Sequence, residues 1–225
     1  MVGLAYRSAG HFPPNALMLG FILSTFGNKI GGLKTSLSMT YLPRRNSISA
    51  MLLGESDEAL SWVEQDLKCH KTLADNPFLL PFLFCRRFAD AISRSLDEQF
   101  DLLHQIEMDS GQTGILLVDV RGRVVPRREG REDDLSLEIL GVAQRAAAIE
   151  ASARGHLLTV ESVRTELSEF MWPEEVSGAK FERRDAQNMF IGKRLDYITR
   201  RVQFSVLRVS NLKERANVQA TAVSV

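Results

Sequence analysis

Apolar residues in the second half of the chain are spaced alternately four and three positions apart. The first such series begins at Leu135 and makes ten successive steps without a break. This spacing predicts one helix with a single packing seam, about 54 Å long at 1.5 Å per residue. Pro173 follows the series and predicts its end. The members of the series are Leu135, Ile139, Val142, Ala146, Ile149, Ala153, His156, Val160, Val163, Leu167 and Phe170.

A second series of this kind closes the chain, and Gly192 is the one residue in it that disfavours a helix, by about 1 kcal/mol relative to alanine. Two long helices joined by a short connection are expected to pack antiparallel. Their seams then either form a core within the chain, which we favour, or bind a second chain as a coiled coil. The seam consists of Ile191, Leu195, Ile198, Val202, Ser205, Val209, Leu212, Ala216, Gln219 and Val223, and its six large aliphatic members, Ile191, Leu195, Ile198, Val202, Val209 and Leu212, form the predicted interaction seam.

The middle of the chain predicts two further helices. The first is expected to open at Ser56-Asp57-Glu58 and to stop near Asp75-Asn76, because Pro77 disfavours helical backbone in the residue before it. The second is expected from Pro81 to about Asp109, with a seam at Cys85, Ala89, Ile92, Leu96, Gln99, Leu103 and Ile106. Residues 115–120 then suggest a short strand, and residues 121–134 a charged loop.

Near the start of the chain the period changes to two. Residues 34–42 and 47–54 alternate apolar and polar side chains on either side of Pro43-Arg44-Arg45-Asn46, which predicts a β-hairpin. Residues 1–33 show no clear period and form a poorly defined segment, in which residues 16–26 suggest a buried strand or helix. That run is too short for a membrane span of about 20 residues.

The expected fold class is therefore mainly α with a small N-terminal β element, an α+β fold dominated by long antiparallel heptad-patterned helices. Residues 34–120 should hold the hairpin, the two middle helices and the short strand, and residues 135–225 a long helical hairpin. With 28 basic and 28 acidic residues the formal net charge is zero, which argues against binding to nucleic acid. A soluble, cytoplasmic chain without direct membrane insertion is expected.

Chemistry-bearing motifs are sparse. Cys69 and Cys85 are interpreted as two buried thiols in a reducing compartment, and a metal site that joins them to His70 would lack a fourth ligand. His156 lies on a helical seam, where a hydrogen-bonded core residue is expected more often than a ligand. No nucleophile, base and orienting group can be named together, so neither an enzyme nor a cofactor is expected.

Two weaker signals concern ions and phosphate. The carboxylates at positions 132–134 have the oxygen ligands that Mg²⁺ or Ca²⁺ prefers, but the arginines beside them favour a solvated loop, and the metal question stays open. Ser47 follows two arginines, as in substrates of basophilic kinases, although an exposed basic turn is the more frequent origin of such a string.

Several segments resemble the cytosolic region of the divergent CorA-like magnesium transporter proteins of filamentous fungi. The hairpin from Leu37 to Gly54 resembles their β segment, and Leu73-Ala-Asp-Asn-Pro-Phe-Leu-Leu-Pro81 resembles the entry to a long helix. Ile106-Glu-Met-Asp-Ser-Gly111 resembles the end of that helix, and Asn211-Leu-Lys-Glu-Arg-Ala-Asn-Val-Gln219 the stalk before the membrane. The resemblance covers residues 35–225 through these patterns.

In that superfamily a cytosolic domain continues through a stalk helix into two transmembrane helices, with a Gly-Met-Asn motif at the pore mouth. The present sequence has neither feature, so no transport residue can be carried over, and the resemblance implies a truncated or degenerate relative. It implies scaffolding or ion-dependent regulation, self-association as in the homo-oligomers of the superfamily, and membrane association if the chain continues. A truncated relative is expected to expose an apolar stripe near residues 209–223 and to assemble with no fixed stoichiometry. The alternative is a free-standing coiled-coil module that binds a helical protein partner.

Overall fold

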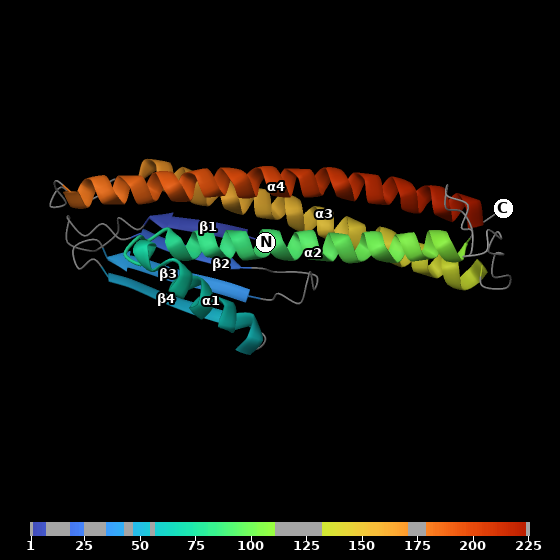
Figure 1. Ribbon diagram of the computed structural model, residues 1–225, viewed down its shortest axis with the longest axis horizontal. Coiled ribbons are helices and arrows are strands. Elements are labelled where there is room, and N and C mark those ends of the chain that lie inside the picture. Colours follow the sequence, from blue (N-terminus) through green and yellow to red (C-terminus); the bar gives the residue numbers. More distant parts are fainter. Residues whose placement is uncertain are drawn as a thin grey trace, which may run out of the picture.

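A computed structural model describes residues 2–7, 19–24, 35–42, 47–54, 57–110, 132–170 and 179–223. Its three long helices are α2 (Leu79–Asp109), α3 (Glu132–Glu169) and α4 (Ala179–Val223). They lie along the long axis of the molecule, with a sheet and the short helix α1 (Asp57–Cys69) packed against one half of the bundle (Figure 1). The predicted class, mainly helical with a small N-terminal β element, is confirmed.

The sheet is a four-stranded antiparallel meander in which each strand pairs with the next along the chain. Its strands are β1 (Val2–Arg7), β2 (Leu19–Ser24), β3 (Thr35–Leu42) and β4 (Ser47–Gly54). The predicted hairpin is confirmed as β3 and β4, with Leu42 opposite Ser47. β1 and β2 fall in the segment for which no definite strand was predicted. β2 reads Leu-Gly-Phe-Ile-Leu-Ser, and such an apolar run shows no period of two to reveal it.

Helix α1 ends at Cys69, earlier than its predicted end near Asn76, and a 3₁₀ turn over Lys71–Leu73 follows it. Asn76 stabilises the turn that precedes α2, because its side-chain Oδ1 accepts a hydrogen bond of 2.9 Å from the backbone N–H of Phe78. The amide of Asn76 also donates to Asn188 of α4 at 2.8 Å, which ties the α1–α2 connection to the last helix. Pro81 lies in the first turn of α2, where its missing N–H leaves no helical hydrogen bond unmade.

Polar contacts between the long helices fix their directions. The side chain of His156 in α3 reaches the backbone carbonyl of Cys85 near the start of α2, and Arg145 in α3 donates to Gln99 farther along α2, so α2 and α3 are antiparallel. Helices α3 and α4 are also antiparallel, as predicted, with Arg164 paired to Asp196 at one end. Consequently α2 and α4 run in the same direction.

One continuous core joins the bundle to the sheet. In β3 the alternate residues Leu37, Met39 and Tyr41 are buried. Tyr41 packs against Phe170 at the end of α3 with ring centroids 6.1 Å apart, and Phe170 in turn meets Phe78 at 5.3 Å. Aromatic contacts of this kind add to the burial energy. They hold the end of the bundle against the sheet.

The structure places the boundary between the charged loop and α3 earlier in the chain than predicted. The charged loop was expected to extend to Asp134, but α3 begins at Glu132, so residues 132–134 form its first turn, where carboxylates complement the helix dipole. The predicted turn at residues 43–46, the short strand at 115–120 and most of the charged loop lie outside the described residues. Within the part of the chain that is described, no helix is long and apolar enough to cross a membrane.

Candidate functional site

The six residues of the predicted interaction seam lie inside the molecule. Their exposed fractions do not exceed 3%, since α4 presents this face to α2 and α3. The seam therefore packs within the chain, which is the interpretation that the sequence favoured over an intermolecular coiled coil. The residues are Ile191, Leu195, Ile198, Val202, Val209 and Leu212.

The exposed apolar stripe expected near residues 209–223 is not observed at the seam positions that the structure describes. Val209, Leu212 and Ala216 are at most 1% exposed, and the polar seam residue Gln219 is also buried. The seam stays covered in this region because α4 packs against both other long helices. An assembly surface on α4 must therefore lie on another face.

His156 is a core residue, as predicted. It is fully buried, its Nε2 lies 2.8 Å from the carbonyl oxygen of Cys85, and its ring meets Phe88 edge to face at 4.9 Å. Burial lowers the pKa of His156 to about 4, which keeps the ring neutral at pH 7. Its Nδ1 has no hydrogen-bond partner among the described residues.

The structure separates the two cysteines by environment. Cys85 is buried, and desolvation raises the pKa of its thiol to about 12, whereas Cys69 is exposed, contrary to the prediction of two buried thiols. Cys69 is the last residue of α1, on the solvent side of an amphipathic helix. The Nδ1 of His70 is hydrogen-bonded to the backbone carbonyl of Asp66 at 2.8 Å. No group of three or more His, Cys, Asp or Glu side chains that could hold a metal ion occurs in the described ranges. Ser47 begins β4 beside a turn that is not described.

A ladder of arginine–carboxylate pairs joins α4 to α2. Arg201 pairs with Asp90 and Arg208 with Asp97, each across 111 residues of sequence. Both partners step by seven residues, so the pairs repeat along two parallel helices at every second turn. A third pair, between Arg215 and Glu107, continues the ladder.

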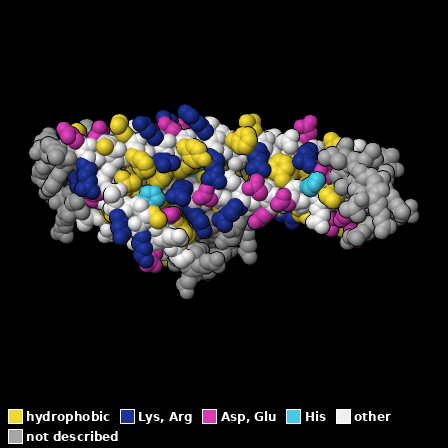
Figure 2. Space-filling model, viewed as in Figure 1, with side chains coloured by type: hydrophobic (Ala, Val, Ile, Leu, Met, Phe, Trp, Pro, Cys, Tyr) yellow, Lys and Arg dark blue, Asp and Glu magenta, His cyan; other side chains and the backbone are white. Residues whose placement is uncertain are grey.

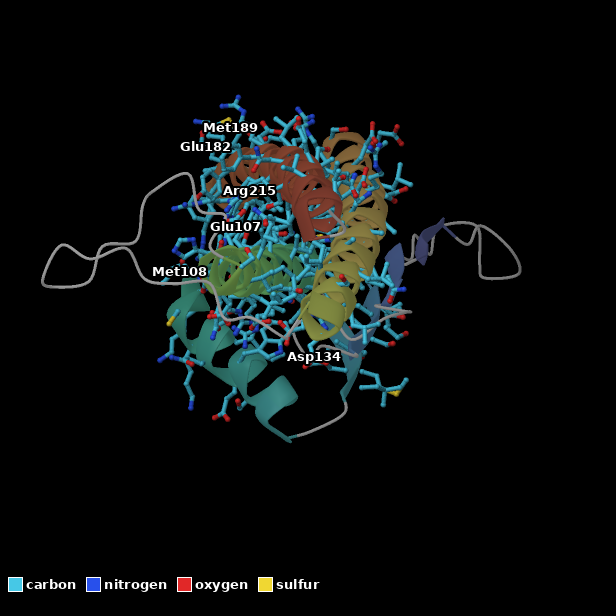
Figure 3. All side chains as sticks on the ribbon, turned by 90° about the vertical axis from the view of Figure 1, so that its right-hand side faces the viewer. Glu107, Met108, Asp134, Glu182, Met189 and Arg215 are labelled. Atoms are coloured by element: carbon cyan, nitrogen blue, oxygen red, sulfur yellow. The ribbon has the colours of Figure 1, made fainter. Side chains whose placement is uncertain are left out.

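The Arg215–Glu107 pair has the most complete geometry of the three. Nε and Nη2 of Arg215 donate to the two carboxylate oxygens of Glu107 at 3.1 and 2.6 Å, a bidentate arrangement between facing helices (Figure 3). The Glu107 side chain is only 11% exposed. The same arginine lies 5.7 Å from the ring centre of Phe100, as Arg208 does at 4.9 Å.

The outward face of α4 carries large apolar side chains at seven-residue intervals. Phe190, Tyr197 and Phe204 are 39%, 59% and 61% exposed, and Leu207 continues the row at 69%. We call these four residues the outer stripe. Figure 2 shows hydrophobic side chains along α4 among basic ones. Recurring exposed rings of this kind mark interaction surfaces more often than isolated ones do.

A groove lies at the upstream end of the outer stripe, where the end of α1 and the start of α2 meet α4. Its volume is about 300 Å³. Three arginines line it, Arg86, Arg194 and Arg201, together with His70 and the rings of Phe82, Phe190 and Tyr197. This basic-aromatic groove combines groups that bind anions with groups that stack on flat rings.

A second hollow lies farther along α4, and Glu150 of α3 lines it together with residues of α4 that include Lys213 and Glu214. Glu150 accepts hydrogen bonds from Lys213 and Arg154, and these bonds lower the pKa of its carboxyl. A carboxylate held ionised between two cations is suited to joining α3 to α4 and poorly suited to proton transfer. We therefore assign the second hollow a structural role.

The outer stripe and the basic-aromatic groove were not predicted from the sequence. The seven-residue spacing of Phe190, Tyr197 and Phe204 is visible in the sequence. The aliphatic seam on the same helix is more regular, however, and the interaction surface was therefore predicted at the seam. The groove brings together residues more than 100 positions apart, so no local motif indicates it. Comparison with known proteins adds no relative: no protein-family model, curated protein or solved structure matches the chain.

Proposed function

We propose that this chain is a non-enzymatic scaffold of the CorA-like cytosolic type, which assembles with further copies of itself through the outer stripe of α4. The observation that carries the proposal is the row of exposed apolar side chains at positions 190, 197, 204 and 207 on a helix whose other face is fully packed. Covering such side chains gives about 25 cal/mol for each Å² of apolar surface removed from water.

The arrangement of the bundle supports this role. The last element is a 45-residue helix, and two earlier long helices brace it along its inner face. Ion pairs at Asp90, Asp97 and Glu107 hold α4 in a fixed register with α2. A braced helix presents its outer side chains in a nearly rigid array, so little conformational entropy is lost when a second copy binds. The CorA-like resemblance supports self-association along a long final helix.

A non-enzymatic role agrees with how the titratable groups are used. Glu150, Glu107 and Asp90 are engaged in ion pairs between helices, and His156 is fully buried. These groups stabilise the bundle and do not converge on a common hollow. No observation on the described residues favours the ion-dependent regulation that the resemblance also implies.

The alternative function is an interaction module that binds a helix from a different protein. The seven-residue spacing of the outer stripe favours this alternative as well, because a helix that packs as a coiled coil returns to the same contact face every seven residues. The two functions differ in whether the purified chain assembles alone.

The experiment measures the mass of the purified chain by light scattering from micromolar to submillimolar concentrations. The mass of the wild-type chain should rise above that of a monomer as the concentration increases. A double variant, Phe204→Ser with Leu207→Ser, should be monomeric, since it removes two side chains that are 61% and 69% exposed and contribute nothing to the core. Circular dichroism of the variant should match the wild type.

A matched control comes from α3. Leu137 and Leu140 are also exposed, at 69% and 54%, and have the same three-residue spacing. The double variant Leu137→Ser with Leu140→Ser should assemble as the wild type does. A wild-type chain that is monomeric at every concentration would exclude self-assembly and favour the heterologous partner, and a control variant that dissociates equally would exclude the outer stripe as the contact surface.

A further inference from the structure

We infer that the basic-aromatic groove binds a phosphomonoester that also carries a flat aromatic ring, either bonded directly to the phosphate oxygen or joined to it through a sugar. The inference does not require self-assembly: the groove shares Phe190 and Tyr197 with the outer stripe, but its other lining residues, the arginines among them, lie outside the stripe. The groove lies among α1, α2 and α4, and its lining includes three guanidinium groups and three aromatic rings.

One arginine in line with the ladder between α2 and α4 has no carboxylate opposite it on α2. Arg194, Arg201, Arg208 and Arg215 follow one another at seven-residue intervals, and the last three each pair with a carboxylate of α2. The position of α2 that corresponds to Arg194, 111 residues earlier, holds Leu83, which is fully buried. Among the described residues Arg194 therefore has no carboxylate partner, and its guanidinium lies 5.2 Å from the ring centre of Phe190.

A second arginine of the groove, Arg86, has only a distant carboxylate to balance its charge. Arg86 lies 3.9 Å from the nearest oxygen of Asp66, which is beyond hydrogen-bonding distance, and its side chain is 45% exposed. Arg201, in contrast, is engaged by Asp90. Arg86 and Arg194 thus bring positive charge to the groove with donors to spare. A phosphate group, with up to two negative charges and three acceptor oxygens, can accept hydrogen bonds from both guanidinium groups.

Three aromatic rings form walls of the groove beside these arginines. Phe82 is buried in the floor, and it meets the His70 ring edge to face with centroids 6.2 Å apart. Phe190 and Tyr197 project from α4 beside the arginines and keep 39% and 59% of their surface exposed. Exposed rings beside guanidinium groups with free donors suit a ligand with a flat face next to its charge, since the ring can stack while the phosphate binds. The volume of about 300 Å³ fits one small molecule.

The test is a calorimetric titration of the full chain with adenosine monophosphate and with phenyl phosphate, beside adenosine, phenol and inorganic phosphate as the separate halves of the two ligands. At least one of the two aromatic phosphates should bind at least tenfold more tightly than either half. Arg194→Gln should weaken that binding about tenfold or more, the loss expected for a charge-assisted bidentate contact. The better of the two ligands distinguishes a nucleotide site from a general aryl phosphate site.

Arg200→Gln is the matched control, because it removes the same charge from an exposed position on the same helix outside the groove. It should bind the ligand as the wild type does, and both variants should melt at the wild-type temperature without ligand. The Phe204→Ser, Leu207→Ser variant should also keep full affinity, so that failure of assembly and failure of the groove are read separately. Equal losses for Arg194→Gln and Arg200→Gln, equal binding of adenosine, or no binding of either aromatic phosphate at millimolar concentration would overturn the inference.

Discussion

The inner and outer faces of α4 are both apolar at seven-residue intervals, yet they differ in composition and in environment. The inner face is aliphatic, and members such as Leu195 and Val202 are at most 1% exposed. The outer face is mostly aromatic, and Tyr197 and Phe204 keep more than half of their surface in water. Branched aliphatic side chains fill the narrow space between three helices, whereas rings flanked by arginines remain outside. A seven-residue repeat of apolar side chains therefore identifies an apolar face of a helix, but it does not determine whether that face is buried in the core or exposed as a contact surface.

The largest expected effect comes from placing the same charge on each face in turn. Leu195→Asp puts a carboxylate where the native side chain is fully buried, and it should cost about 4 kcal/mol or more and unfold the chain at room temperature. Phe204→Asp on the outer face should change the unfolding free energy of the monomer by about 0.5 kcal/mol or less. Urea denaturation followed by circular dichroism measures both. Similar costs for the two variants would mean that the faces do not differ as described.

A second effect concerns the one histidine on the inner seam of α3. Burial lowers the pKa of His156 to about 4 from its ordinary value of 6.5. Below pH 6.5 the unfolded chain takes up a proton there that the folded chain does not, so this contribution to stability is complete above pH 6.5 and is lost toward pH 4. Between pH 7.5 and pH 5 the loss should be about 2 kcal/mol.

His156→Gln should remove this pH dependence, because glutamine retains a donor for the Cys85 carbonyl and does not titrate. His104→Gln is the control, since the His104 side chain is 61% exposed. The unfolding free energies of the three proteins, measured by urea denaturation at both pH values, decide the matter. If His156→Gln loses as much stability as the wild type at pH 5, other groups cause the acid sensitivity.

The sequence predicted most of what depends on regular periods. The four-three spacing from Leu135 to Leu167 corresponds to α3, and the alternation in residues 34–54 corresponds to β3 and β4. It did not predict β1 or the early end of α1, and for β2 it left a buried strand and a buried helix as alternatives, because these residues show no alternation. In each of these segments tertiary packing decides the structure more than local pattern does.

The candidate site was less predictable than the fold. The arginine ladder requires α2 and α4 to be parallel in one register, and that register is known only once Asp90 and Arg201 are seen to pair. Only then does Arg194 stand out as the arginine without a carboxylate. The groove therefore depends on an alignment of two helices that no local spacing contains.

A third, smaller effect tests the boundary between the two faces, where the ladder lies. Glu107→Gln should cost about 1 to 2 kcal/mol, because it weakens a bidentate pair whose carboxylate is 11% exposed. Asp97→Asn should cost about 0.5 kcal/mol or less, since that carboxylate is 57% exposed and water screens its pair with Arg208. Thermal unfolding at low and high salt separates the two variants. An equal cost for both would indicate that burial does not distinguish the rungs of the ladder.

The smallest effect is a gain in stability at Gly192, beside the inner seam. A methyl group there would meet Leu167 of α3 at 3.7 Å, an ordinary van der Waals contact, and glycine costs about 1 kcal/mol in a helix interior relative to alanine. Gly192→Ala should therefore raise the unfolding free energy by about 0.5 to 1 kcal/mol. Gly141→Ala in α3 is the matched control, because its nearest neighbour, at 3.4 Å, is the flexible end of Arg145. It should gain a similar amount through helix propensity alone. If Gly141→Ala stabilises and Gly192→Ala destabilises, α3 and α4 approach each other more closely than described, and the glycine is needed for inner-face packing.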